Sequence, residues 1–140
     1  MDQVKAWQPK QIWTRTFICA YRNVPTSDSR VIGPDAIISR RRLPVPVFAV
    51  FPHVIGRVTF LNESDDGSFW ADVELNRDPS KLESGLYPQM DLGVGSWVTV
   101  EEHSVWSPEP EVTRVLKGEV DFTALHLGHR PAWPTLQPIT

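Results

Sequence analysis

Thirteen prolines are distributed along this chain of 140 residues, and they restrict its possible folds more than any other feature. Proline has a fixed φ angle and no backbone N–H, so it breaks a helix from within. Together with the eight glycines, the prolines argue against long helices and favour short strands joined by turns. At this length the chain is expected to form one domain with a single hydrophobic core.

Two parts of the chain show the alternation of apolar and polar residues that is typical of half-buried strands. One is residues 13–21, and the other is a pair of runs at residues 55–61 and 69–75. The dipeptide Asp66-Gly67 between these runs tolerates positive φ angles and predicts a β-hairpin. The residues of the second run that should point inward are Phe69, Ala71, Val73 and Leu75, and those that should point outward are Trp70, Asp72 and Glu74.

Further strands are predicted within residues 43–51, 97–105 and 113–127. The first of these segments contains two prolines, which cannot donate hydrogen bonds to a sheet, so its first half belongs at a sheet edge or at a strand start. A short helix is expected after Asp78, because an aspartate cap followed by proline is a common helix start. The chain is therefore expected to be mainly β with minor α structure.

Charge and composition exclude several classes of function. The net charge is −3 with no basic half, so specific nucleic-acid binding is not expected. No segment is long and apolar enough to span a membrane, and no signal peptide opens the chain, so we expect a soluble protein made in the cytoplasm. No phosphate-binding loop or metal-ligand spacing is present, and neither a cofactor nor a metal is expected. The lone Cys19 is expected to be buried and reduced.

Several segments occur in an order and at spacings that carry a family resemblance. They are Asn23–Ile37 (NVPTSDSRVIGPDAI), Leu43–Val50 (LPVPVFAV), Ile55–Val58 (IGRV), Asp91–Val98 (DLGVGSWV) and Ala124–Pro134 (ALHLGHRPAWP). Over roughly residues 20–134 they resemble the prohead (capsid maturation) proteases of tailed phages. The resemblance implies a fold like that of the herpesvirus assemblins, a small antiparallel β-barrel that is closed or nearly closed. We expect this barrel at residues 13–130, between extended arms at residues 1–12 and at the proline-rich residues 131–140.

The resemblance also implies where catalytic residues would stand. In the two plausible registers the serine nucleophile position falls on Gly93 or on Gly95, and the histidine position falls on Phe51. The acidic residue that the family often has on its closing strand is absent at residues 124–126. We therefore expect no catalytic residues and no enzymatic activity.

An alternative alignment of the chain with the family retains a set of catalytic residues. Herpesvirus assemblins use one serine and two histidines, and Ser96, His53 and His126 resemble that set if the register shifts at two places. The chain would then be an active serine endopeptidase that cuts capsid or scaffold precursors.

The resemblance without a nucleophile suggests a structural protein of a phage virion, made in the host cytoplasm and then located in the capsid. We expect a decoration, stabilising or minor capsid protein whose partner is the major capsid protein, another virion structural protein or a second copy of itself. A transient assembly scaffold or chaperone is a further alternative, because it needs the same fold and no chemistry.

Aromatic and basic residues are the candidate contacts with such partners, since tryptophan and arginine dominate many interfaces. The tryptophans in or near irregular segments are Trp7, Trp13, Trp106 and Trp133. Packing in the core is the alternative for each of them. The basic run Arg40, Arg41 and Arg42 predicts either a solvated turn or a docking site for an acidic surface.

Overall fold

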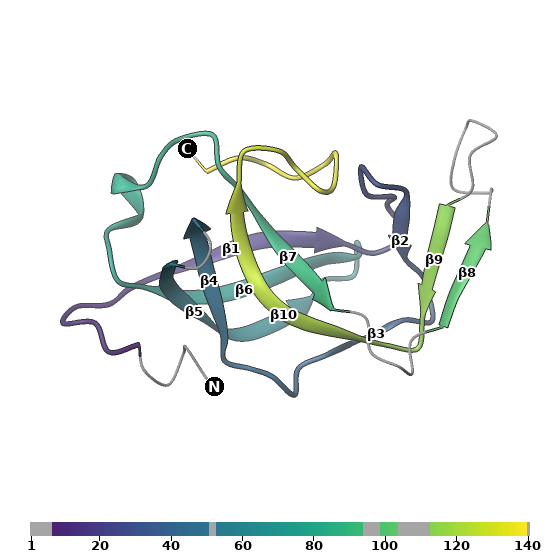
Figure 1. Ribbon diagram of the computed structural model, residues 1–140, viewed down its shortest axis with the longest axis horizontal. Helices are drawn as coiled ribbons and strands as arrows, with labels where there is room; N and C mark the ends of the chain where they lie inside the picture. Colours follow the sequence, from purple (N-terminus) through teal and green to yellow (C-terminus); the bar gives the residue numbers. More distant parts are fainter. Residues whose placement is uncertain (1–6, 51–52, 94–98, 104–112, 140) are drawn as a thin grey trace.

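The computed structural model describes residues 7–50, 53–93, 99–103 and 113–139. These residues form ten strands and one short 3₁₀ turn, which confirms the prediction of a mainly β protein (Figure 1). The elements are β1 (Trp13–Tyr21), β2 (Arg30–Ile32), β3 (Ile37–Ser39), β4 (Val45–Val50), β5 (His53–Glu63), β6 (Ser68–Leu75), η1 (Pro79–Lys81), β7 (Tyr87–Gly93), β8 (Thr99–His103), β9 (Thr113–Lys117) and β10 (Glu119–Gly128). The predicted cap is present, since Asp78 Oδ1 accepts a hydrogen bond from the Ser80 N–H at 3.0 Å.

Strands β5 and β6 form the predicted hairpin. They pair antiparallel, and the turn between them contains Gly67 at a φ of 86°, a conformation that glycine adopts without strain. The four residues of β6 that were expected to point inward are all buried. Local sequence chemistry is therefore sufficient to specify this part of the fold.

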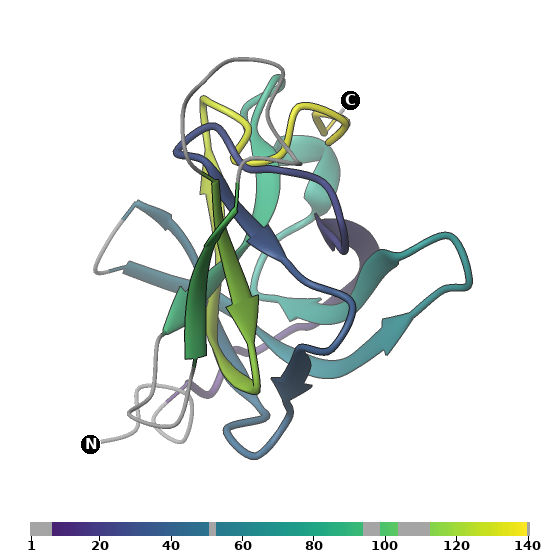
Figure 2. The ribbon, with the colours of Figure 1, turned by 90° about the vertical axis from the view of Figure 1, so that its right-hand side faces the viewer.

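Strand β10 organises the larger sheet, whose order is β1-β6-β5-β4-β10-β3. One edge of β10 pairs in parallel with β3 and, further along, with β4, while its other edge pairs antiparallel with β7. Strands β2, β9 and β8 form a separate three-stranded sheet, which lies nearest the viewer in Figure 2. The larger sheet is therefore mixed, and β10 is the strand that joins β3, β4 and β7.

The prediction of an antiparallel β-barrel is wrong in two respects. The parallel pairing of β10 with β3 and β4 makes the sheet mixed. The sheet also stays open, because β7 lies beside β1 without any hydrogen-bonded ladder between these two described strands. A curled but open sheet leaves one edge at β1 and another at β7. The unpaired backbone groups at such edges are usually covered by another part of the chain.

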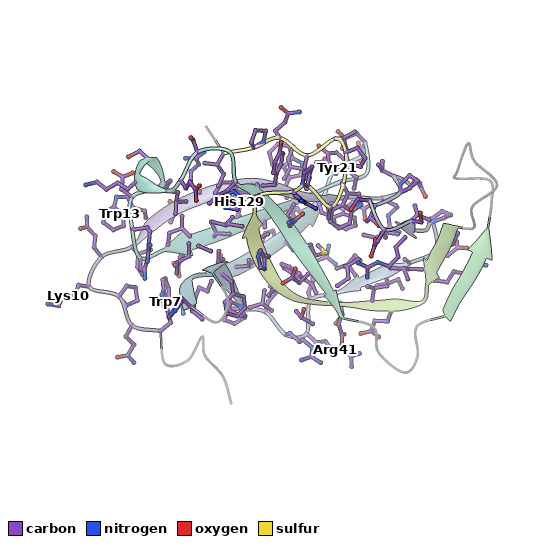
Figure 3. The ribbon with its side chains drawn as sticks, turned by 45° about the horizontal axis from the view of Figure 1, so that its top comes forward. Trp7, Lys10, Trp13, Tyr21, Arg41 and His129 are labelled. Carbon is purple, nitrogen blue, oxygen red and sulfur yellow. The ribbon has the colours of Figure 1, made fainter. Side chains whose placement is uncertain are left out.

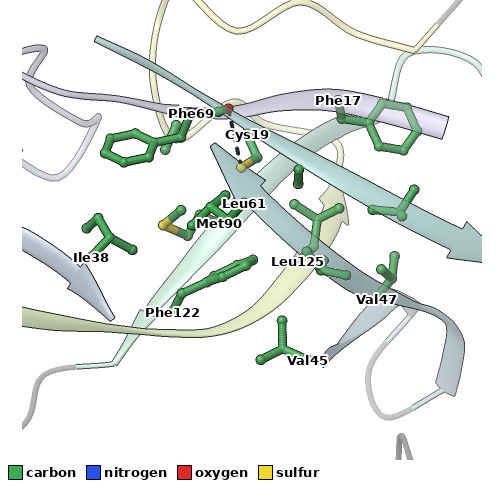
Figure 4. Packing of buried hydrophobic residues seen from close by; sticks show 14 of the residues in the cluster. Phe17, Cys19, Ile38, Val45, Val47, Leu61, Phe69, Met90, Phe122 and Leu125 are labelled. Atoms are coloured by element: carbon green, nitrogen blue, oxygen red, sulfur yellow. Dashed lines mark hydrogen bonds between the residues drawn. The ribbon is translucent and has the colours of Figure 1, made fainter. Parts of the chain in front are cut away.

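The core lies inside the curl of this sheet. Its side chains come from nearly every strand, and Figure 4 shows Phe17, Cys19, Ile38, Val45, Val47, Leu61, Phe69, Met90, Phe122 and Leu125 packed together. Cys19 is fully buried, as predicted, and its Sγ lies 3.6 Å from the carbonyl oxygen of Phe69. Burial raises the pKa of the Cys19 thiol, so this group stays protonated and behaves as a small apolar residue.

Arg22 joins three parts of the chain directly after β1. Its guanidinium makes two hydrogen bonds to the carboxylate of Glu63, at 2.6 and 2.9 Å. It also donates to the carbonyls of Gly33 and Ala36, at 2.6 and 2.7 Å. The planar fork of arginine suits this arrangement, which ties the end of β5 to the connection between β2 and β3.

The C-terminal segment, residues 131–139, is part of the core. Trp133, Leu136 and Ile139 are 1%, 3% and 5% exposed. Ile139 also exchanges backbone hydrogen bonds with the chain before β7, donating to the Leu86 carbonyl at 2.8 Å and accepting from the Gly85 N–H at 3.1 Å. Burial of these apolar side chains therefore holds residues 131–139 of the expected C-terminal arm on the fold.

Further contacts show that this segment bridges β7 and β1. From β7, Gln89 donates to the Arg130 carbonyl at 3.1 Å and accepts from the Ala132 N–H at 2.6 Å. From β1, the Tyr21 hydroxyl donates to the Thr135 carbonyl at 3.4 Å. In Figure 1 the segment runs across the top of the molecule above both strands. It thus covers the opening that the sheet leaves between β1 and β7.

Replacing Trp133 by alanine should destabilise the protein strongly. The substitution leaves a large cavity in the core beneath the opening, and such a loss costs about 3–5 kcal/mol. The free energy of unfolding, measured by urea titration with circular dichroism, should fall by an amount in that range.

Thr135→Ala is the matched control in the same segment. Its side chain is exposed, and its carbonyl still accepts from Tyr21, so its unfolding free energy should stay within about 0.5 kcal/mol of the wild type. Equal unfolding midpoints for the two variants would show that the C-terminal segment does not hold the fold together.

Candidate interaction surface

The outer face of β1, β6 and β5 carries two exposed aromatic side chains. Trp70 on β6 stands opposite Ile18 on β1 and Asn62 on β5, and Phe60 on β5 stands opposite Asp72 on β6. Directly opposed residues of antiparallel strands share one face of a sheet. Trp70 is 37% exposed and Phe60 is 50% exposed. We call Ile18, Phe60 and Trp70 the Trp70 surface.

The hairpin turn fixes the orientation of the Trp70 indole. Trp70 Nε1 donates to Ser68 Oγ at 2.9 Å, and Ser68 Oγ donates to Asp66 Oδ1 at 2.6 Å. The Ser68 backbone N–H also donates to Asp66 Oδ1, at 3.0 Å. These bonds from Ser68 lower the pKa of the Asp66 carboxyl, so it remains an acceptor at neutral pH. Trp70 is therefore both accessible and held in one orientation.

A pocket adjoins the Trp70 surface, between β1 and the C-terminal segment. Its walls include Arg15, Ile18 and Trp70 from the sheet, and Pro88, Pro138 and Ile139 from β7 and the C-terminal segment. The exposed Arg15 guanidinium lies 5.4 Å from the centre of the Phe17 ring, and it forms no ion pair with any residue that the structure describes. The pocket thus combines apolar and polar side chains with one exposed cation that lies over an aromatic ring.

Of the four tryptophans proposed as partner contacts, the three that the structure describes lie elsewhere. Trp7 is half-buried, with its ring 5.6 Å from the Arg57 guanidinium, and Trp13 is half-buried at the start of β1. Figure 3 shows both at the end of the molecule that is opposite β8 and β9. Trp133 is 1% exposed, so a partner cannot reach its side chain in this fold. Trp106 lies outside the described residues.

The basic run is engaged within the chain. Arg40 Nε donates to a backbone carbonyl of β5 at 3.0 Å. Arg41 pairs with Glu119, and Arg42 lies 3.3 Å from the carboxylate of the buried Asp121. These contacts attach the turn between β3 and β4 to β5 and β10. The run therefore has a structural role at this turn, and its docking role remains a prediction.

The structure describes two of the three residues of the alternative protease set, His53 and His126. His126 on β10 and Asp91 on β7 are neighbours, with Nδ1 of the histidine 3.9 Å from Oδ2 of the aspartate. Burial raises the pKa of Asp91, and the nearby His126 partly opposes this shift. His53 is exposed at the start of β5 and lines a separate shallow pocket with Arg77. Ser96 lies outside the described residues.

Two of these features were missed in the sequence. Trp70 was predicted to point outward but was not chosen as a contact residue. A large aromatic residue at a solvent-facing position of a strand is a sequence signal for such a contact. The Asp91–His126 pair depends on the pairing of β7 with β10, which joins segments more than thirty residues apart in the chain. Single-sequence patterns do not specify such long-range register.

No other chemistry stands out in the described residues. Among them, no group of three or more histidine, cysteine, aspartate or glutamate side chains is placed to hold a metal ion. The same residues contain no helix with the length and apolar character needed to cross a membrane. Comparison of the chain with models of known families, with curated proteins and with solved structures gave no match.

Asp91→Asn should make the protein more stable at pH 7. The raised pKa means that the folded state disfavours the charged carboxylate, and asparagine removes that charge. As the pH falls through the folded pKa of Asp91 towards the unfolded value of about 3.9, the wild-type carboxyl is protonated and the advantage should disappear. Urea unfolding of both proteins at pH 7 and pH 4 measures this difference.

Asp65→Asn, at an exposed position in the hairpin turn, is the control and should show no such pH-dependent gain. If Asp91→Asn were equally destabilising at both pH values, the pair with His126 would be a favourable contact and the assigned burial effect would be wrong.

Proposed function

We propose that this protein is a non-catalytic structural protein of a tailed-phage virion, built on a degenerate prohead-protease fold. The ordered sequence resemblance supports the family. The oriented, exposed Trp70 on a sheet face next to a pocket is the observation that carries a binding role. Capsid decoration or stabilisation, or a place as a minor capsid protein, is the proposed task.

The Trp70 surface has the properties of an interface anchor. Tryptophan contributes more to binding than most residue types, especially where its side chain fills a pocket of the partner. An indole that is already held by Ser68 loses little conformational freedom on binding, so less of the binding free energy is lost to ordering. Exposed Phe60 on the same face extends the apolar contact area.

The open sheet departs from the barrel that the proposed ancestry implies. The family resemblance implies a closed or nearly closed barrel, and here β7 lies beside β1 with the C-terminal segment covering the opening. We propose that this open sheet derives from a barrel of the prohead-protease type that has lost the hydrogen-bonded ladder between two of its strands. The proposed location is the phage capsid, and the proposed partner is the major capsid protein.

Binding to capsid shells tests this function. Purified protein should sediment with shells assembled from the major capsid protein of the same phage, and Trp70→Ala should weaken this association at least tenfold, because loss of a hot-spot tryptophan costs about 2 kcal/mol or more. Circular dichroism should show that the variant remains folded.

Ile37→Ala is the control, since Ile37 is another exposed large apolar residue, 65% exposed on β3. It should leave the association unchanged. Failure of the wild-type protein to bind shells would contradict the proposed function. Full binding by Trp70→Ala would remove the Trp70 surface from it.

An active serine endopeptidase is the second candidate, and the Asp91–His126 pair is the observation that favours it. A carboxylate next to a histidine is the orienting half of a catalytic triad. If this activity exists, the protein should cleave the capsid precursor, and both Ser96→Ala and His126→Ala should abolish cleavage. Ser84→Ala, at an exposed serine before β7, should cleave normally. Cleavage that survives Ser96→Ala would end this assignment.

A further inference from the structure

We propose that the Trp70 surface binds an arginine side chain of a partner protein, with the guanidinium stacked on the Trp70 indole and hydrogen-bonded to the carboxylate of Asp72. This inference rests on the proposed function, since it names the chemical group that the partner presents to the surface. It is carried by the position of Asp72 beside two exposed aromatic rings, by the charge state of its surroundings and by the fixed orientation of Trp70.

Asp72 stands in the middle of the outer face of β1, β6 and β5. It lies opposite Thr16 on β1 and opposite Phe60 on β5. Trp70 is two residues before Asp72 on β6, so the two side chains are neighbours on the same face. Phe60 and Trp70 are diagonal neighbours across the hairpin, a separation that aromatic and other long side chains can span. A group that lies between the two exposed rings is therefore also next to a carboxylate.

The Asp72 carboxylate is held in place but keeps its charge. Asp72 is exposed, and its Oδ1 accepts a hydrogen bond from the Thr16 hydroxyl at 2.8 Å. A neutral hydroxyl orients a carboxylate without compensating its negative charge. An ionised carboxylate has about four acceptor positions on its two oxygens, so several remain for the N–H groups of a guanidinium.

The arginines nearest to this face do not neutralise Asp72. Arg57 is on the same face, but it pairs with Glu74 at 2.6 Å. Arg15 stands opposite the buried Val73, which places it on the other face of the sheet. Within the described part of the chain, neither arginine forms an ion pair with Asp72. The carboxylate is therefore open to a cation from a partner.

Negative charge is concentrated around the Trp70 surface. The hairpin, residues 53–75, contains five carboxylates and one arginine, so its formal net charge is −4 with His53 neutral, whereas the whole chain has a net charge of −3. Two of these carboxylates, Asp65 and Asp66, lie in the exposed turn. Charge complementarity then favours a basic partner at this face.

Arginine fits this site better than lysine does. Its planar guanidinium can stack on an aromatic ring while its edge donates to a carboxylate. Tryptophan attracts cations more strongly than the other aromatic residues do. The bond from Trp70 Nε1 to Ser68 Oγ, at 2.9 Å, fixes the indole beside Asp72 before binding. The structure thus assigns to the partner an arginine with apolar neighbours, which contact Phe60 and Ile18.

Blocked peptides test this assignment without any phage protein. The probe is Ser-Leu-Arg-Leu-Ser, and lysine or glutamate replaces its arginine in the comparison peptides. Each is titrated into the ¹⁵N-labelled full chain, and the Trp70 indole N–H and the backbone amides of β6 are followed. The arginine peptide should shift these signals saturably. The glutamate peptide should bind about tenfold more weakly, because it loses the cation–π contact and the ion pair, and the lysine peptide should fall between the two.

Charge reversal on the protein provides the decisive comparison. Asp72→Lys should bind the glutamate peptide more tightly than the arginine peptide, which reverses the wild-type order. Asp35→Lys makes the same charge change at an exposed position between β2 and β3, outside the hairpin, and should keep the wild-type order.

Two milder variants separate the contributions of charge and ring. Asp72→Asn removes only the charge and should reduce the difference between the arginine and glutamate peptides. Trp70→Leu keeps an apolar side chain without an aromatic face and should weaken binding of the arginine peptide. Circular dichroism should show that every variant remains folded.

The inference is overturned if the wild type binds the arginine and glutamate peptides equally, if the arginine peptide shifts no β6 amide at millimolar concentration, or if Asp72→Lys keeps the wild-type order. Shell binding separates this failure from failure of the proposed function. Shells that bind the protein while the arginine peptide fails contradict arginine recognition alone, whereas a peptide that binds while shells fail contradicts the virion role alone.

Discussion

Burial of Trp133, Leu136 and Ile139 at the opening between β1 and β7 is the interaction on which the rest of the structure depends. The larger sheet curls but lacks a ladder between these two strands, so backbone hydrogen bonds do not close it. The side chains of the C-terminal segment instead pack into the hydrophobic core. Without them, the core inside the curl would be open to water along one side.

The same segment helps to form the candidate site. Pro138 and Ile139 form one wall of the pocket, and Arg15 and Trp70 belong to the opposite side. Each wall is supported separately, since the C-terminal segment is held by Gln89 and the Trp70 indole is held by Ser68. A surface with both walls fixed before binding suits a protein that functions by docking.

The parts of the fold that local chemistry specifies were predictable from sequence. The hairpin of β5 and β6 follows from alternation and from Asp66-Gly67, and the cap at Asp78 follows from its proline neighbour. The C-terminal segment was not predictable in this way. Its prolines indicated an extended arm, and its apolar residues are buried only because β1 and β7 leave a space for them.

Burial also decides which tryptophans a partner can reach. Trp70 was expected to point outward from its strand, and Trp133 in the proline-rich tail was expected either to contact a partner or to pack in the core. The structure exposes Trp70 and buries Trp133, with exposed fractions of 37% and 1%. The parallel pairing of β10 and the proximity of Asp91 to His126 likewise depend on strands distant in sequence, which alternation within one strand does not reveal.

Hydrogen exchange at the Ile139 amide is the most direct test of this account. That amide donates to the Leu86 carbonyl at 2.8 Å, and it is protected only if the C-terminal segment stays on the fold. We expect the Ile139 amide to exchange orders of magnitude more slowly than in an unfolded chain, with protection close to that of the β7 amides. Exchange of Ile139 at the unfolded rate, while β7 stays protected, would show that the segment is a free arm and would contradict the account.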